Sequence, residues 1–503
     1  MNNTRSEFGD WQTPLTLAYE ICHTLKKHGF SPTTLIEPTC GRGNFIKAAL
    51  EVFDDIKCVY AIEIHKPYID EIRYLQTEYP CVAFYIYNQS VFDFDFRSLQ
   101  DENLLLIGNP PWVTNSYMSS IEGGNLPTKS NIKKYKGLEA MTGKSNFDIS
   151  EFIMLSLIEA LANRQGQFAF LLKNSVIRNL VYGKITDIGA GDFSQYKIDA
   201  QKEFGASADA SLFIGKLNTD NTKQECQVYN FYTQEYLHTF GRINNLPVSD
   251  IASYQKYAPI DGCSPFVWRS GIKHDCSKVM ELSKDQLGNY INGLCEDVSI
   301  EEDLLYPLAK SSDISKKDTT HRKYVLITQR KTSDDTLFIR DKFPKTYNYL
   351  KGHRLYLDAR KSSIYKNRPP YCIFGVGDYS FYPYKVAISS LYRSTLFTLL
   401  RPINGKPIMI DDTCYSIGFM DEEAASITSS ILNSSYVQNF INSISNNDSK
   451  RIITKELLMR IDILEALSML TNKELDITET QRLKYTQHII AQSTDIRELK
   501  LFS

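Results

Sequence analysis

Four consecutive residues, Asn109-Pro110-Pro111-Trp112, have the types and order needed to hold an amino group that is attached to a ring. They follow the apolar run 104–107, which is typical of a buried strand. Prolines lack N–H donors, so the segment offers the Asn109 side-chain oxygen and the Pro110 carbonyl as acceptors. Trp112 would supply an aromatic plane for the ring. The alternative is a turn that ends a strand, with Trp112 as a core residue.

A second candidate is the segment Glu37-Pro38-Thr39-Cys40-Gly41-Arg42-Gly43, between a predicted strand at 34–36 and a predicted helix at 44–53. Glycines in such a turn let the backbone approach a ligand, and the helix N-terminus adds N–H donors. The segment is not G-x-G-x-x-G and no Gly-Lys-Ser/Thr follows, which disfavours a nucleoside triphosphate. A tight turn without a ligand is the alternative. Glu63 ends the next predicted strand and could accept both hydroxyls of a ribose.

Strands and helices must alternate to position these residues. Predicted buried strands at 59–64, 82–87 and 104–107 are separated by helical patterns, and Thr13-Pro14 is predicted to cap and start the first helix. This alternation predicts an α/β fold with a mostly parallel sheet that is covered on both faces. Open sheets of this kind bind ligands at the carboxyl edge of their strands. Residues 113–147 lack any periodic pattern, which is typical of a functional loop or a disordered insertion.

The length of 503 residues exceeds what one core supports, so two domains are expected, at 1–245 and 260–503. The formal net charge of −2 excludes a globally basic coat for nucleic acid. Residues 316–368, however, hold 15 Lys and Arg against 5 Asp and Glu, a local balance of +10. Basic charge interleaved with tyrosines is the footprint of a nucleic-acid surface, and a solvated charged face is the alternative. The candidate contacts are Arg360, Lys361, Lys366 and Arg368.

Other classes of protein are disfavoured. No window reaches about 18 uninterrupted apolar residues and the N-terminus lacks a signal-peptide pattern, so neither a membrane span nor secretion is expected. The ten cysteines form no Cys-x-x-Cys pair, which predicts reduced thiols in a cytoplasmic protein and no metal site. The eight histidines include no His-Glu-x-x-His motif of a zinc hydrolase.

The Thr-Pro helix start, the glycine turn, Glu63 and the Asn-Pro-Pro-Trp segment, in this order, resemble class I S-adenosylmethionine-dependent DNA methyltransferases that act on N6 of adenine. The order of the halves resembles the gamma group of bacterial restriction–modification systems. The second half resembles the specificity regions of these enzymes through segments at 268–275, 306–308, 374–377 and 411–413. The resemblance implies a doubly wound, mostly parallel sheet with a C-terminal α+β target-recognition domain.

The resemblance also implies roles for individual residues. Asn109, Pro110, Pro111 and Trp112 would form the catalytic edge, and Trp112 and Phe204 would stack on the target base. S-adenosylmethionine would be the cofactor. Ser90 stands where the family often has an acidic residue that contacts the adenine ring of the cofactor, which is a departure from the pattern. The residues implied to bind the cofactor are Thr13, Glu37, Thr39, Cys40, Gly41, Gly43, Glu63 and Ser90.

The implied reaction is methyl transfer to adenine N6 in double-stranded DNA after the base has been flipped out of the helix. A partner restriction endonuclease would share the recognition site. Two alternatives stay open: an RNA or protein-glutamine N-methyltransferase, because the same tetrapeptide suits those nitrogens, and a catalytically silent DNA-specificity module.

Overall fold

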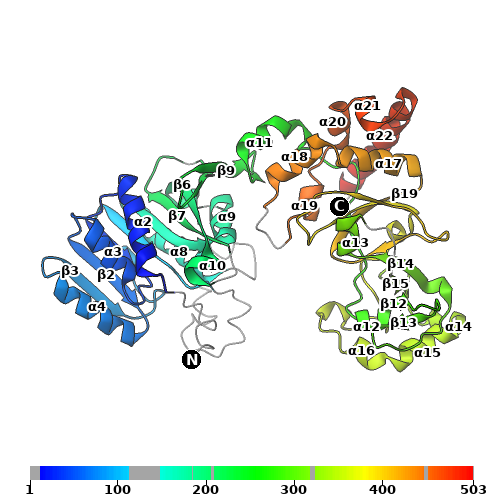
Figure 1. The fold of residues 1–503 in the computed structure, drawn as a ribbon, viewed down its shortest axis with the longest axis horizontal. Helices are drawn as coiled ribbons and strands as arrows, with labels where there is room; N and C mark the ends of the chain where they lie inside the picture. The colour runs from blue at the N-terminus through cyan, green and yellow to red at the C-terminus, as the bar shows by residue number, and fades with distance from the viewer. Residues whose placement is uncertain are drawn as a thin grey trace. The chain divides into compact units, whose positions relative to one another are not determined.

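The structure is a computed structural model that describes residues 12–112, 148–183, 185–205, 209–221, 223–317, 323–446 and 451–501, with side chains up to residue 492. The chain divides into two compact units, Met1–Ala252 and Ser253–Ser503 (Figure 1). The division lies inside the stretch that separates the two predicted domains. The pattern-free stretch 113–147 lies outside the described residues. None of the described helices combines the length and apolar character that a membrane span needs.

The first unit is built on one ten-stranded sheet in the order β10-β9-β8-β6-β7-β5-β4-β1-β2-β3. Strands β3, β2, β1, β4 and β5 are parallel, whereas β7 lies antiparallel between β5 and β6. Neighbours β1 and β4 are not consecutive in the chain, so the strand order reverses there. The strands are β1 (Thr34–Glu37), β2 (Cys58–Glu63), β3 (Ala83–Asn88), β4 (Leu104–Gly108), β5 (Gly166–Lys173), β6 (Ala190–Ile198), β7 (Ala210–Leu217), β8 (Glu225–Asn230), β9 (Tyr236–Ile243) and β10 (Leu246–Val248).

Helices cover both faces of this sheet, as the alternating pattern predicts. Helices α2 (Leu15–Lys27), α3 (Asn44–Val52) and α4 (Lys66–Glu78) bury their apolar stripes in one core, against the inner residues of β1, β2 and β4. Helices α8 (Ile149–Ala160) and α9 (Asn174–Tyr182) pack in the other core. The fold is therefore the doubly wound α/β arrangement that the sequence predicts.

Three details differ from the sequence expectations. Pro14, not Thr13, is the N-cap of α2, and no side chain caps this helix. Strand β3 is half-exposed rather than buried, because it is the edge of the sheet and has a neighbour on only one side. The sequence does not predict strands β6, β9 and β10, and the residues of β6, Ala190–Ile198, mix polar and apolar types without strict alternation.

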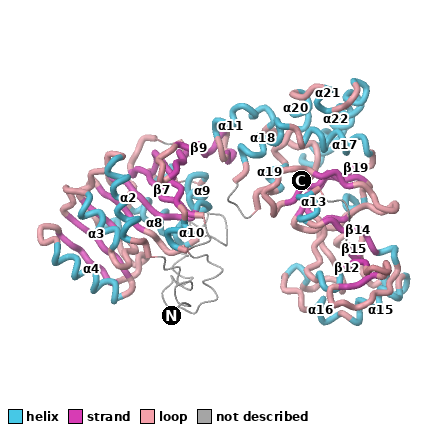
Figure 2. The backbone as a smooth tube through the Cα atoms, in the orientation of Figure 1, coloured by secondary structure: helices cyan, strands magenta, loops and turns pink. Residues whose placement is uncertain are grey.

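The second unit contains two smaller sheets and a group of helices (Figure 2). One sheet has the order β13-β12-β15-β14-β18 and the other β11-β19-β16-β17. The strands are β11 (Arg269–Ser270), β12 (Glu281–Lys284), β13 (Tyr290–Asn292), β14 (Leu305–Ala309), β15 (Lys323–Leu326), β16 (Tyr384–Ser389), β17 (Thr398–Leu400), β18 (Met409–Ile410) and β19 (Cys414–Phe419). The mixed composition agrees with the α+β expectation.

Most helices of the second unit fall into two groups. The basic segment forms short helices beside the five-stranded sheet: α14 (Phe338–Lys342), α15 (Pro344–Gly352) and α16 (Arg354–Asp358). Helix α13 (Ser311–Lys316) packs on β16. The C-terminal group begins with α17 (Glu422–Leu432), which packs on β16 and β19, and continues with α18 (Ser435–Ile444), α19 (Lys455–Leu458), α20 (Ile463–Ser468), α21 (Asn472–Leu475) and α22 (Glu479–Leu501).

Segments far apart in the sequence meet backbone to backbone in this unit. A Cβ at Gly271 would collide with the carbonyl oxygens of Ile410 and Asp411, and a Cβ at Gly375 would collide with the carbonyl of Gly271. Gly375 also has a φ of +68°, which a residue with a side chain rarely adopts. These contacts bring together three of the segments on which the resemblance to specificity regions rests.

Candidate active site

The glycine turn forms a closed loop at the carboxyl ends of β1 and β2. The Cys40 N–H donates to the Ile62 carbonyl at 3.0 Å, and the Gly43 N–H donates to the Cys40 carbonyl at 2.8 Å. Gly41 has a φ of +49°, and a Cβ on it would collide with the side chain of Gln12. The Asn44 side chain donates to the Thr13 carbonyl at 2.8 Å, which ties the segment before α2 to the start of α3.

Glu63 fastens this turn to β2. One carboxylate oxygen accepts from the Gly41 N–H and the other from the His65 N–H, both at 2.8 Å. Each carboxylate oxygen can accept a further hydrogen bond, so the group is fixed in place and still able to take hydroxyls. Asn88, which the sequence analysis missed, donates to the carbonyls of Glu63 and Ile64 at 3.0 and 2.9 Å. Its position at the end of the third strand was the available signal.

Three buried polar atoms at this edge have no partner among the described residues: Thr13 Oγ1, Glu37 Oε2 and Thr39 Oγ1. Buried polar atoms are almost always paired, so a cluster of unpaired ones indicates a missing ligand. Burial and the nearby Glu63 raise the pKa of the Glu37 carboxyl well above its usual value. A ligand with an ammonium group would supply the missing charge, and the hydroxyls could bind a carboxylate. The residues present therefore fit the methionine part of S-adenosylmethionine.

Two other predicted cofactor residues are engaged within the fold. The Cys40 thiol donates to the Ile62 carbonyl at 3.2 Å, and burial raises its pKa. Its main-chain N–H and carbonyl are also hydrogen-bonded, so only the second lone pair of the carbonyl could accept from a ligand. The Ser90 hydroxyl accepts from the Phe92 N–H at 3.3 Å, and the Ser90 carbonyl accepts from the Asp93 N–H at 3.0 Å. Ser90 thus shapes the turn after β3.

The Asn-Pro-Pro-Trp segment leaves β4 directly beside the cofactor cradle, by which we mean the glycine turn with Thr13, Glu37 and Glu63. A Cβ on Gly108, the residue before Asn109, would lie 3.8 Å from the Glu37 side chain. Asn109 is half-buried and Pro110 is buried. Strand pairing places β4 between β1 and β5 at the point where the strand order reverses. The structure therefore brings the predicted catalytic edge and the predicted cofactor residues to the same edge of the sheet.

Trp112 and Phe204 are in contact, although 92 positions separate them. Their ring centroids lie 5.4 Å apart with an interplanar angle of 75°. Trp112 is buried, and its indole N–H donates to the Leu171 carbonyl at 3.3 Å, whereas Phe204 is half-buried at the end of α10 (Ala200–Phe204). A base could be held between the two rings only after they move apart, so their stacking roles remain predictions.

The predicted DNA contacts have different environments. The Arg360 guanidinium donates to the carbonyls of Leu357 and Cys372, both at 2.8 Å, and lies 3.8 Å from the centre of the Tyr365 ring. Two of its five N–H donors are therefore used within the fold. Lys361, Lys366 and Arg368 are exposed instead. These three side chains are better placed than Arg360 to bind a DNA phosphate.

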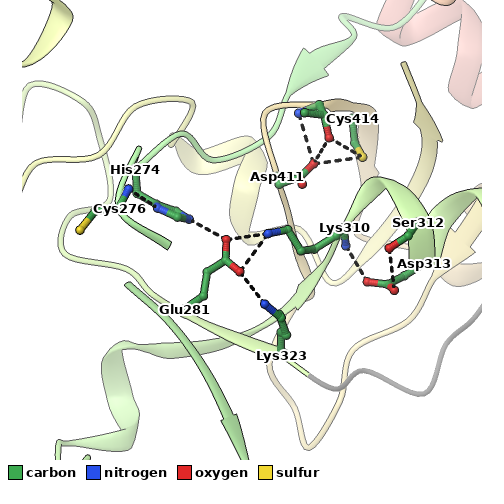
Figure 3. Close-up of polar contacts among 10 residues, drawn as sticks. His274, Cys276, Glu281, Lys310, Ser312, Asp313, Lys323, Asp411 and Cys414 are labelled. Atoms are coloured by element: carbon green, nitrogen blue, oxygen red, sulfur yellow. Dashed lines mark hydrogen bonds and ion pairs between the residues drawn. The ribbon is translucent and has the colours of Figure 1, made fainter. Parts of the chain in front are cut away.

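A buried carboxylate organises the centre of the second unit (Figure 3). Glu281, which is 5% exposed, accepts from Lys310 at 2.7 and 2.9 Å and from Lys323 at 3.1 Å, and lies 3.4 Å from His274. Burial alone would raise the pKa of Glu281, but hydrogen bonds from His274 and the lysines lower it to about 2. The cluster joins β12, β15 and the segment 271–276, so it serves the fold of this unit.

Comparison with known proteins agrees with the site. No model of a known protein family matches the chain. The type II methyltransferase M.NspV of Nostoc sp. (strain ATCC 29411 / PCC 7524) is 41% identical over 470 residues, which cover 92% of this chain and 98% of that protein. Among solved structures, the type IIL restriction–modification enzyme MmeI in complex with DNA aligns with a TM-score of 0.52. That alignment has 12% identity and covers 98% of this chain and 74% of MmeI.

The fold is that of a class I methyltransferase, and the predicted cofactor and catalytic residues lie at one edge of its sheet. At this level of identity over nearly the full length of both proteins, the chain belongs to the family of type II methyltransferases.

Proposed function

We propose that this protein transfers a methyl group from S-adenosylmethionine to the N6 amino group of adenine in double-stranded DNA, as the modification enzyme of a restriction–modification system. The observation that carries the proposal is the position of Asn109 and Pro110 directly after β4, whose last residue, Gly108, lies against the side chain of Glu37, a carboxyl with one unpaired oxygen. The type II relative and the likeness to a DNA-bound restriction–modification enzyme support DNA as the substrate.

The residues of this chain act on the target amino group by positioning it. When bound, S-adenosylmethionine supplies an activated methyl group. The Asn109 side-chain oxygen and the Pro110 carbonyl would accept the two amino hydrogens. Pro110 and Pro111 have no backbone N–H, so the segment presents no donor of theirs to the amino group. Accepting both hydrogens favours a pyramidal nitrogen whose lone pair points away from the ring. Because the methyl group is already activated, no covalent enzyme intermediate is needed. Positioning and electrostatics by the fixed acceptors then account for the rate.

The target base must leave the helix to reach this edge, at a cost of a few kcal/mol. Stacking on Trp112 would return about 1–3 kcal/mol, by analogy with aromatic platforms for single strands. Phe204 would take the opposite face once the two rings separate. Exposed Lys361, Lys366 and Arg368 would bind the DNA backbone. A cytoplasmic location and a partner endonuclease that cuts the same site belong to the same proposal.

The test is a methyl-transfer assay with purified protein and labelled S-adenosylmethionine on three substrates: duplex DNA, RNA and total bacterial protein. The proposal expects label in duplex DNA only, recovered as N6-methyladenine after digestion to nucleosides. Label in RNA or in protein glutamine would favour the alternative methyltransferases. Binding to DNA without any transfer would indicate a silent specificity module. The Asn109→Ala variant is the matched control for background label.

A further inference from the structure

One lysine holds together the described residues on either side of positions 113–147. The Lys173 ammonium, at the end of β5, donates to the Trp112 carbonyl at 3.0 Å and to Asp148 Oδ2 at 2.7 Å. Trp112 is the last described residue before that stretch and Asp148 is the first after it. The sequence analysis did not single out Lys173, which follows an apolar strand and has no motif around it.

The prolines explain why such a link is needed. The parallel ladder between β4 and β5 ends at the pair Gly108 and Phe170. Pro110 and Pro111 have no N–H, so they cannot continue the ladder. Beyond Gly108, two contacts of β5 with Trp112 replace the ladder hydrogen bonds. The Leu171 carbonyl accepts from the indole N–H, and Lys173 donates to the Trp112 main-chain carbonyl. Together they fix both the ring and the backbone of Trp112.

Asp148 keeps the lysine in place. Its Oδ1 caps α8 by accepting from the Ser150 N–H at 3.1 Å and the Ser150 hydroxyl at 2.8 Å, which leaves Oδ2 for Lys173. The side chains of Lys173 and Asp148 are only 20% and 8% exposed. Separating a shielded ion pair would leave each buried charge uncompensated, which is costly. The pair therefore holds the two side chains in a defined geometry.

We propose that Lys173 is a positioning residue that orients Trp112, and through it the Asn109-Pro110 acceptor edge, for methyl transfer. The inference rests on the proposed function, because it takes Trp112 as the platform for the target base. Lys173 acts through Trp112. A small displacement of that edge would cost about 100-fold in rate, since near-attack geometry is sensitive to about 1 Å.

The experiment compares four variants of the full chain. Lys173→Met removes the ammonium and keeps the volume, and Lys173→Arg restores a cation with donors. Asp148→Asn retains an N-cap side chain but loses the charge that holds Lys173. Lys216→Met is the matched control, because it removes the 2.9 Å ion pair of Lys216 with Asp192 elsewhere on the same sheet.

The first measurement needs no substrate: acrylamide quenching of Trp112, taken as the difference between each variant and the same variant carrying Trp112→Phe. Lys173→Met and Asp148→Asn should make Trp112 more accessible, whereas Lys173→Arg and Lys216→Met should leave it near the wild-type value. Unchanged quenching of Trp112 in Lys173→Met would overturn the proposal.

The second measurement is single-turnover methyl transfer, with cofactor affinity and thermal melting measured alongside. Lys173→Met should lose about 10- to 100-fold in rate while cofactor affinity stays within twofold, and Lys173→Arg should recover most of the rate. A loss that arginine does not recover, with an equal loss of cofactor affinity and melting temperature, would overturn it in favour of a general role in folding. Wild-type protein that transfers no methyl group to DNA would contradict the proposed function, while the quenching result would still decide the position of Trp112.

Discussion

At the scale of single residues, Glu37 is a buried acid with an unpaired oxygen. Its carboxyl is buried, one oxygen has no partner among the described residues, and burial together with Glu63 raises its pKa well above the usual value of 4.5. An acid with a raised pKa favours folding while it is protonated. This stabilisation is lost as the pH rises from the unfolded value through the folded pKa. A bound ammonium group would offset the free-energy cost of ionising the buried Glu37 carboxyl.

This environment predicts pH-dependent cofactor binding. The ammonium of S-adenosylmethionine should pair with ionised Glu37 and lower its pKa, so binding releases a proton and affinity rises with pH until the pH exceeds the raised pKa of the free protein. Glu37→Gln should abolish the proton release and weaken binding about 10-fold or more. Calorimetry in buffers with different ionisation enthalpies measures the protons released. Equal proton release in wild type and variant would place the ammonium elsewhere.

Glu63 combines a structural and a binding role. Because it accepts from the Gly41 and His65 N–H groups, truncation would open the glycine turn as well as remove a ligand. Glu63→Gln is the sharper variant, since it keeps the shape and one of the two accepted N–H bonds while it loses the charge. We expect cofactor affinity to fall about 10- to 150-fold, through loss of a charge-assisted hydrogen bond worth about 1.5–3 kcal/mol. DNA binding at the same temperature should be unaffected, and calorimetry that finds equal cofactor affinity would contradict the ribose assignment.

At the scale of elements, strand β16 carries a buried lysine. The Lys385 ammonium is 2% exposed and donates to the carbonyls of Tyr382 and Ile408 at 3.0 and 2.8 Å. Burial lowers its pKa from 10.5 to about 7. The unfolded chain therefore binds more protons than the folded chain between these two values, and folding stability gains from this group as the pH rises through that window.

Lys385→Met tests this effect. The wild type should gain up to about 1.4 kcal/mol per pH unit from this group above pH 7, and the variant should lack that contribution. Chemical denaturation of both proteins at several pH values measures the difference in slope. Parallel pH profiles would show that the ammonium stays charged in the folded state.

The sequence predicts elements better than contacts between them. The alternation of strands and helices predicts that Glu63 and Asn109 lie at the carboxyl edge of the sheet, because the hydrophobic pattern indicates which strands are buried and that they run parallel. The link from Lys173 to Asp148 depends on which strands become neighbours, which no local pattern encodes. Arg360 shows the same limit, because a charge count does not reveal that its guanidinium donates to the carbonyls of Leu357 and Cys372. Thr13 was expected to cap a helix, but its hydroxyl is unpaired in the cofactor cradle.

At the scale of the whole molecule, the first unit holds the proposed cofactor and acceptor residues, and the second holds the basic segment. If that segment binds DNA, neutralising Lys361, Lys366 and Arg368 together should weaken DNA binding. The slope of log affinity against log salt should become shallower by about 0.9 per lost phosphate contact. Cofactor affinity should not change, because the cradle belongs to the other unit.

Arg360→Ala is the contrasting variant. It should destabilise the second unit through lost hydrogen bonds while leaving the salt slope unchanged. DNA titrations at several salt concentrations, combined with thermal melting, separate the two effects. An unchanged slope in the triple variant would mean that this surface is merely solvated.

The most direct test of the central claim is sequencing that reports modified bases in genomic DNA. Cells carrying the wild-type gene, the Asn109→Ala variant and no gene would be compared. We predict N6-methyladenine at one recurring sequence in the wild type alone, with Asn109→Ala protein still binding S-adenosylmethionine because the cofactor residues are unchanged. Methylated cytosine, no modified base, or N6-methyladenine at the same sites with Asn109→Ala would contradict it.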